Sequence, residues 1–150
     1  MPSFYFAYGS NMDTERLRGR APGMRPRGRA RLVGWRLAFD KRGGDGTAKA
    51  NIHPAAGALT WGVVYACSED DLRALDRYEG VSAGHYRRER VVVIAEDGRE
   101  LEAITYVAEP DFVDPTLRPA TWYLEAVLRG AREHGLGPEA MATIERAACA

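Results

Sequence analysis

The amino-acid sequence predicts a single α+β domain, residues 1–150, built on a mostly antiparallel sheet that is curved or barrel-like. Three observations lead to this fold class. Segments with strand character dominate the middle of the chain, two helical patterns close it, and strands do not alternate with helices as βαβ units require. A length of 150 residues suits one domain with its own hydrophobic core.

The expected strands are short apolar segments bounded by glycine or other turn residues. They cover residues 4–8, 30–39, 48–52, 59–67, 86–94 and 101–107. Gly34 predicts an irregularity within the second segment, and the glycine-rich stretch 42–46 predicts the turn after it. Asp97-Gly98 separates the last two segments, which indicates a tight hairpin.

Helices are expected where capping residues precede helical spacing. Asp13 can cap a short polar helix that extends through Leu17. Ser68 and Asp71 form a capping-box pattern that opens a helix over residues 69–78.

Two further helices are expected at the end of the chain. The first begins near Pro119 or Ala120 and ends at His134-Gly135, and the second runs from Pro138 to about Ala148. A stripe of apolar residues at helical spacing should bury one face of the first: Trp122, Tyr123, Ala126, Val127 and Ala131. The prolines at 110, 115 and 119 predict a non-helical segment before it.

Composition argues against several classes of protein. Cys67 and Cys149 belong to no CxxC pair, and the chain shows neither a signal-peptide pattern nor an apolar run of the roughly 20 residues that a membrane span needs. We therefore expect a cytoplasmic protein without a membrane partner. The three histidines lack metal-ligand spacing, so neither a metal nor another cofactor is expected.

Charge is unevenly distributed along the chain. Residues 14–50 hold eleven basic side chains and three acidic ones, although the whole chain has no net charge. Such a stretch is compatible with phosphate binding, which leaves RNA binding as a weaker alternative. Prolines and glycines interrupt the arginines, and no helix-turn-helix or RNA-binding motif accompanies them. We expect a solvated loop and strand, and no nucleic-acid partner.

One carboxylate falls on an apolar helix face. Glu79 directly follows the helix expected over residues 69–78. It lies seven residues after Leu72 and four after Leu75, so it projects from the same side as these leucines. The other charged residues of the helix are expected at the surface. Burial would raise the pKa of Glu79 toward neutrality, where a carboxylate is a useful general base. Gly80 then allows the helix to stop.

The position of Glu79 also has a purely structural interpretation. Its carboxylate could pair with Arg87, Arg88 or Arg90, or the helix could end early and release it to solvent. On the helical pattern alone this interpretation is slightly favoured.

A second candidate feature follows the first strand. Tyr8-Gly9-Ser10-Asn11, the YGSN loop, can present main-chain N–H groups to a carboxylate or a developing oxyanion. Taken alone it is also an ordinary turn at a strand end. Ser10 is not expected to act as a hydrolase nucleophile, because the G-x-S-x-G pattern is absent.

Four short segments, each weak by itself, follow one another in a particular order and separation. They are residues 5–11 (YFAYGSN), 61–65 (WGVVY), 75–86 (LDRYEGV followed by GHY) and 131–136 (AREHGL). Taken together, they resemble the γ-glutamylcyclotransferase family, and the resemblance spans nearly the whole chain.

The resemblance implies a small mixed, mostly antiparallel β-barrel with flanking helices and one deep cavity. It also implies a catalytic role for Glu79 as general acid and base. The residues implied to bind a small-molecule γ-glutamyl substrate are Tyr5, Phe6, Ala7, Tyr8, Gly9, Ser10, Asn11, Tyr86 and Tyr123.

The expected activity is that of a lyase-type cyclotransferase that needs no metal or cofactor. The α-amine of the substrate attacks its own γ-glutamyl amide, which releases 5-oxoproline and an amine or amino acid. The alternative is a non-catalytic module that binds a small ligand on the same fold. The loop from Lys41 to Lys49, expected at the cavity mouth, is shorter than in animal-type members. The chain also stops soon after its final helix, and a homodimer is left as an open expectation.

Overall fold

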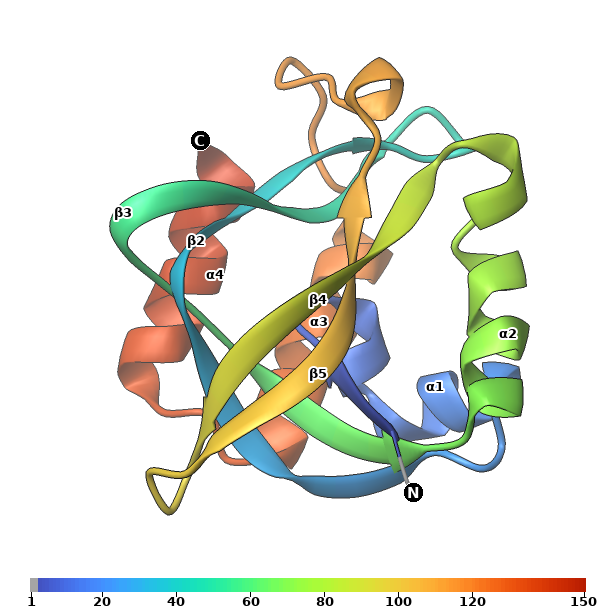
Figure 1. Cartoon of the computed structure of the whole chain (residues 1–150). Helices are drawn as coiled ribbons and strands as arrows, with labels where there is room; N and C mark the ends of the chain where they lie inside the picture. Colours follow the sequence, from blue (N-terminus) through green and yellow to red (C-terminus); the bar gives the residue numbers. More distant parts are fainter. Residues whose placement is uncertain (1–2) are drawn as a thin grey trace.

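Five strands close into one barrel in the computed structural model, which describes residues 3–150 (Figure 1). The strands are β1 (Ser3–Ala7), β2 (Arg25–Arg42), β3 (Ala48–Cys67), β4 (Tyr86–Ala95) and β5 (Glu100–Ala108). Their order around the barrel is β1-β3-β2-β4-β5. The pairs are antiparallel except for β1 with β5, which are parallel and close the barrel. The predicted α+β class with a small mixed barrel is confirmed.

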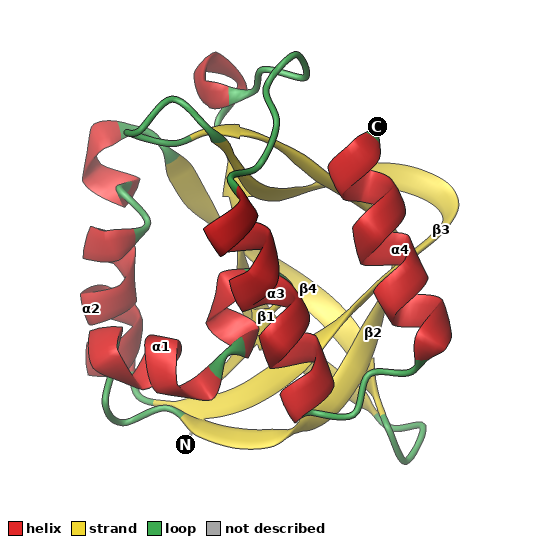
Figure 2. Ribbon diagram, turned by 180° about the vertical axis from the view of Figure 1, so that it is seen from behind, coloured by secondary structure: helices red, strands yellow, loops and turns green. Residues whose placement is uncertain are grey.

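Four α-helices flank the barrel within residues 3–150: α1 (Thr14–Arg20), α2 (Glu69–Tyr78), α3 (Thr121–Glu133) and α4 (Pro138–Cys149). Seen from behind, α3 lies between α2 and α4 in front of the sheet (Figure 2). The predicted caps are present, since Asp13 caps α1 and Ser68 forms a reciprocal capping box with Asp71. Within the described residues, no helix has both the length and the apolar character of a membrane span.

Short 3₁₀ turns connect several of these elements. They are η1 (Ser10–Met12) after β1, η2 (Val81–Ala83) after α2 and η3 (Pro110–Phe112) after β5. The last of these corrects the expectation of a wholly non-helical proline segment. Pro110 lies in the first turn of η3, a position where its missing N–H costs no hydrogen bond.

The strand β3 corrects another expectation from the sequence. Residues 48–52 and 59–67 were expected as two strands, but they form one strand of 20 residues. The pairing with β2 shifts register between Val33 and Trp35, opposite residues 55–58 of β3. Gly34 and Gly57 both have positive φ angles, 88° and 80°, which allows the two strands to bend together without breaking.

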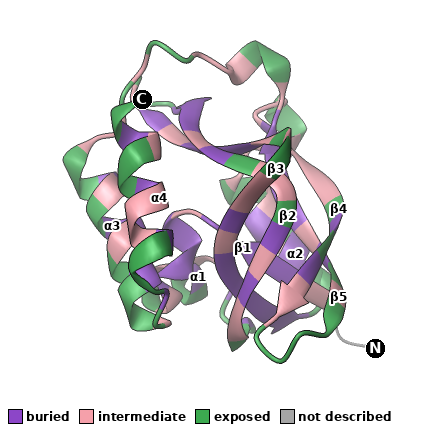
Figure 3. Ribbon diagram, turned by 90° about the vertical axis from the view of Figure 1, so that its left-hand side faces the viewer, coloured by how far each residue is buried: buried purple, intermediate pink, exposed green. Residues whose placement is uncertain are grey.

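Helix α3 packs one face onto the barrel, as its apolar spacing predicts. Tyr123, Ala126, Val127 and Ala131 are buried, and the burial view shows further buried stretches along the barrel strands (Figure 3). Trp122 was wrongly placed on this face, since it is 51% exposed. It stands at the first turn of α3, where its ring instead covers the cationic groups of Arg16 and Lys49.

Helix α3 lies against the backbone of η1 at Gly130. A Cβ atom on this residue would lie 2.4 Å from the backbone of Met12 and of Asp13. These two residues directly follow the YGSN loop. Gly130 therefore sets the distance between α3 and that loop.

We expect Gly130→Ala to lower the free energy of unfolding by about 1–3 kcal/mol, because the added methyl group would push α3 away from η1. Gly19→Ala is the matched control, since nothing lies within 4 Å of a Cβ at Gly19 in α1. The control should be neutral, or stabilising by up to about 1 kcal/mol. Urea unfolding of both variants checks this, and equal stability of the two would contradict the proposed contact.

Candidate active site

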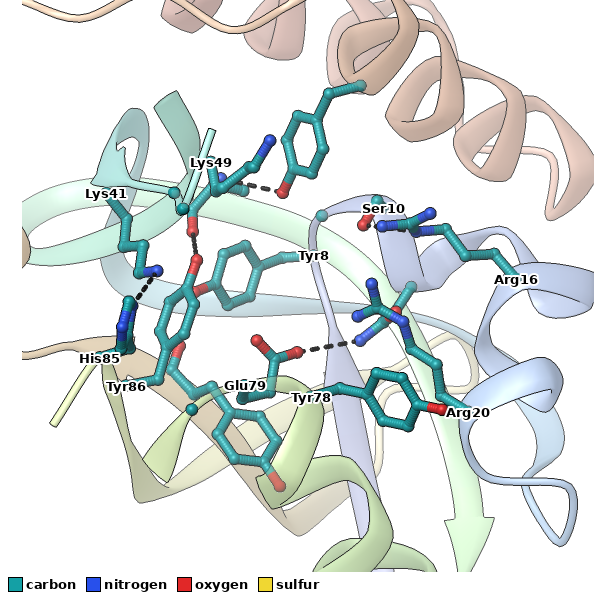
Figure 4. A pocket seen from close by; sticks show the side chains of 18 of the residues that line it. Tyr8, Ser10, Arg16, Arg20, Lys41, Lys49, Tyr78, Glu79, His85 and Tyr86 are labelled. Carbon is teal, nitrogen blue, oxygen red and sulfur yellow. Dashed lines mark hydrogen bonds between the residues drawn. The ribbon is translucent and has the colours of Figure 1, made fainter. Parts of the chain in front are cut away.

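A cavity of about 300 Å³ opens at one end of the barrel (Figure 4). Its walls come from the loop after β1, helix α1, the turn between β2 and β3, the end of α2 and the start of β4. These elements are distant in sequence, and the barrel brings them together. Seven of the nine residues predicted to bind substrate line this cavity, together with Glu79.

Glu79 reaches the cavity from the C-terminal end of α2. Its backbone N–H donates to Leu75 O at 2.9 Å, which keeps Glu79 on the helix, and Gly80 then turns the chain away with a φ of 65°. The Glu79 carboxylate accepts a hydrogen bond from Asn11 Nδ2 at 3.2 Å. This bond joins the predicted catalytic residue to the YGSN loop, 68 residues earlier in the chain.

The arginines that follow α2 do not neutralise Glu79. Each of the three has another acidic partner: Arg87 pairs with Glu109, Arg88 with Asp76 and Arg90 with Glu102. Within residues 3–150, no ion pair shorter than 4.0 Å includes Glu79. The salt-bridge interpretation of Glu79 is therefore overturned.

Burial raises the pKa of the Glu79 carboxyl above its ordinary value. The cationic groups of Arg20 and Lys41, the hydrogen bond from Asn11 and the more distant Arg16 act in the opposite direction, and they offset only part of the effect. The carboxylate is thus held in the cavity without the close countercharge that would keep it permanently ionised.

Asn11 is the most connected polar residue of the loop. Its Nδ2 group donates to Tyr5 Oη at 3.0 Å as well as to Glu79. Its other side-chain atom, Oδ1, is buried and has no hydrogen-bond partner among the described residues. An unpartnered buried carbonyl oxygen costs about 1–3 kcal/mol, and a ligand that donates an N–H to it would recover this energy.

The YGSN loop leaves no room for a side chain at Gly9. A Cβ atom there would lie 2.9 Å from Ala50 Cβ and 3.3 Å from Tyr123 Oη. Tyr123 Oη accepts from Ala50 N at 3.0 Å, and Tyr86 Oη donates to Ala50 O at 2.6 Å. Tyr123 of α3 and Tyr86 of β4 therefore fix the backbone of β3 at Ala50, the residue that faces Gly9.

Phe6 and Ala7 are the predicted site residues that do not line the cavity. Both are buried in the core, with exposed fractions of 0% and 1%. In β1 alternate side chains point to opposite faces, so Tyr5 and Phe6 cannot both face the cavity. We leave Phe6 and Ala7 out of the proposed site.

Four cationic side chains line the cavity: Arg16, Arg20, Lys41 and Lys49. Lys41 and Lys49 bound the loop that was expected at the cavity mouth, whereas Arg16 and Arg20 were not predicted there. Arg16 Nε donates to Ser10 Oγ at 3.1 Å, and the Arg20 guanidinium covers the ring of Tyr78 at 5.0 Å. The expectation that the arginines of this basic stretch are solvated is therefore wrong for these two. Their spacing of four residues on a helix beside the YGSN loop is the signal that could have identified them.

Comparison with known proteins agrees with the fold and with the motifs. Residues 60–142 match the AIG2-like family. The γ-glutamylcyclotransferases of Bos taurus and Homo sapiens are each 34% identical to this chain over 137 residues, which covers 88% of the chain and 71% of either relative. A solved structure described as a γ-glutamyl cyclotransferase superposes with a TM-score of 0.88 at 30% identity, covering 97% of this chain and 87% of that one.

By these similarities the chain is a member of the AIG2-like family, with the barrel typical of γ-glutamyl cyclotransferases. Within that class, it belongs to the γ-glutamylcyclotransferase family and is an enzyme of that type.

The contact between Gly9 and Ala50 can be tested by a pair of substitutions. Gly9→Ala should lower the free energy of unfolding by about 1–3 kcal/mol, because the new methyl group would overlap that of Ala50. Adding Ala50→Gly removes the opposing methyl group and should recover part of the loss. Thermal unfolding of the two single variants and the double variant measures the coupling, and strictly additive effects would contradict the contact.

The raised pKa of Glu79 predicts a pH-dependent effect of Glu79→Gln on stability. The folded state holds the Glu79 proton more tightly than the unfolded state, so wild-type stability falls as pH rises above the ordinary glutamate pKa near 4.5. Wild-type stability stops falling once the pH exceeds the pKa that Glu79 has in the folded state. Glutamine does not titrate, so the stability of the variant relative to wild type should increase from pH 4 to pH 8. Urea unfolding across this range checks the sign, and a decreasing difference would contradict it.

Proposed function

We propose that this chain cyclises a γ-glutamyl amide and releases 5-oxoproline and the free amine. The nitrogen of the substrate α-amine attacks the γ-carbonyl carbon, and the bond from that carbon to the leaving nitrogen breaks. The observation that carries the proposal is the Glu79 carboxyl, which lines the cavity without an ion-pair partner among the described residues and has a raised pKa.

Glu79 would serve the proton transfers that accompany attack and departure. As a carboxylate it accepts a proton from the α-ammonium group, which frees the nitrogen lone pair for attack. As a carboxylic acid it returns that proton to the departing nitrogen, so the reaction leaves Glu79 as it began. The attacking nitrogen loses its second proton to solvent as the lactam forms, and the released amine takes up a proton from solvent. A pKa closer to the working pH favours a group that must accept and release a proton in one cycle.

The YGSN loop would position the substrate beside Glu79. The unpartnered Asn11 Oδ1 is suited to accept an N–H from the α-ammonium group. Arg16, bonded to Ser10, and the main chain of the loop would face the α-carboxylate. Correct positioning of an intramolecular nucleophile corresponds to effective molarities of roughly 10⁵–10⁸ M, so this is a large contribution to catalysis. The substrate supplies its own nucleophile, and the mechanism needs no metal or cofactor.

A panel of γ-glutamyl amino acids and γ-glutamyl amines tests the proposal, with 5-oxoproline detected by mass spectrometry. Release of 5-oxoproline from at least one member is expected. Binding of these compounds without turnover would favour the alternative of a ligand-binding module.

Glu79→Gln should reduce turnover by about 10²–10⁴-fold, because the amide cannot carry the proton. Substrate affinity should be reduced far less, since the loop and the tyrosines remain. Glu102→Gln is the matched control, because Glu102 is exposed and pairs with Arg90 on the outside of the barrel. It should retain near wild-type turnover. A folded Glu79→Gln protein with near-normal 5-oxoproline release would exclude the catalytic assignment.

A further inference from the structure

Lys41 is a buried cation without an acidic partner. It is 5% exposed, and among residues 3–150 no carboxylate oxygen lies within 4.0 Å of its Nζ atom. Buried charges in proteins are normally paired, because removing an ion from water is costly. Lys49, on the same cavity wall, shows the ordinary arrangement, with its Nζ atom 3.2 Å from Asp45 Oδ2. The lack of a carboxylate partner therefore distinguishes Lys41 from Lys49. Arg16 and Arg20, the other cavity cations without an ion pair among the described residues, lie on the loop side.

The surroundings of Lys41 hold its amine in one place. Nζ lies 2.8 Å from His85 Nδ1 and stands 5.0 Å from the ring centre of Tyr86 and 5.4 Å from that of Phe112. The His85 ring in turn stacks on Phe112, with 3.9 Å between ring centres.

The hydrogen bond to His85 uses only one of the N–H donors of Lys41. An ammonium group has three N–H donors and no acceptor, so Nδ1 of His85 accepts one hydrogen bond and the imidazole is neutral. The remaining two N–H groups have no acceptor among the described residues. Burial lowers the pKa of Lys41, and an anion bound to these two groups would raise it again.

Lys41 lies on the side of the cavity away from the loop. Figure 4 shows Lys41 and His85 on one side of Glu79, and Ser10, Arg16 and Arg20 on the other. In the function proposed above, the γ-glutamyl group lies against the loop and its scissile bond lies at Glu79. The leaving group must then extend toward Lys41.

We propose that Lys41, held by His85, is a specificity-determining residue that binds a carboxylate on the leaving group. This inference rests on the proposed function. It assigns a partner to each charged group of the substrate. Glu79 faces the α-ammonium group, Arg16 faces the α-carboxylate, and Lys41 faces the second carboxylate. Substrates whose leaving group is an amino acid would then be preferred over those that release an uncharged amine.

Two substrates of nearly equal shape test the subsite, γ-glutamylalanine and γ-glutamylalaninamide, which replaces the second carboxylate with a neutral amide. The quantity compared is the ratio of kcat/KM for the acid to that for the amide. Wild type should favour the acid, and Lys41→Met should lower the ratio about tenfold or more, the usual effect of losing a hydrogen bond to a charged group. Any change in the pKa of Glu79 affects both substrates alike and cancels in the ratio.

Two further variants separate the subsite from a general cationic field. Lys49→Met removes a cation from the same wall and should leave the ratio close to that of wild type, whereas Lys41→Arg keeps the charge and should retain most of the preference. An equal fall in the Lys49→Met variant would overturn the assignment to Lys41. A wild-type ratio of one or below would overturn it without reference to any variant. If wild type releases no 5-oxoproline from either substrate but does so from another member of the panel, the subsite is overturned and the proposed function stands. Release from no member of the panel overturns the proposed function and the subsite with it.

Discussion

The constraint on which the site depends is the placement of one carboxylate, Glu79, in a cavity without a close countercharge. Placing it there requires α2 to be fixed firmly, because a rotation of the helix about its axis would turn Glu79 away from the cavity. Asp76, three residues earlier, provides this attachment. It accepts two hydrogen bonds from Arg88 on β4 and one from Tyr106 on β5. Asp76 was expected at the surface, yet it is half-buried and joins the helix to the barrel.

The tyrosines around Glu79 complement this arrangement. Burial raises the pKa of Tyr5, Tyr8, Tyr86 and Tyr123, so their hydroxyl groups stay neutral and act as hydrogen-bonding groups. Two of them brace the cavity wall: Tyr8 Oη donates to Tyr106 O, and Tyr86 Oη donates to Ala50 O. We therefore propose different roles for these groups: Glu79 exchanges protons, and the tyrosines maintain the shape of the cavity.

The basic stretch over residues 14–50 contributes to two walls of the same cavity. Its first part forms α1, which brings Arg16 and Arg20 to the loop side. Its last part forms the end of β2 and the start of β3, which bring Lys41 and Lys49 to the opposite rim. Cations on both sides of a single carboxylate suit a ligand with more than one negative charge. Four of the eleven basic residues of this stretch thus line a small-molecule cavity, and one of them, Lys41, is the basis of the proposed preference for a leaving group that carries a carboxylate.

The sequence by itself determined the features that depend on local physics. The capping box of Ser68 and Asp71 predicted the limits of α2, helical spacing put Glu79 on the face of Leu75, and Asp97-Gly98 predicted the hairpin between β4 and β5. Only the tertiary structure decided that β3 is one strand, that Trp122 faces outward, that Phe6 and Ala7 lie in the core, and that Arg16, Arg20 and Lys41 face the cavity. Caps, turns and helical periodicity act between residues a few positions apart. Which side chain faces a cavity depends instead on elements that are far apart in sequence and meet only when the barrel closes.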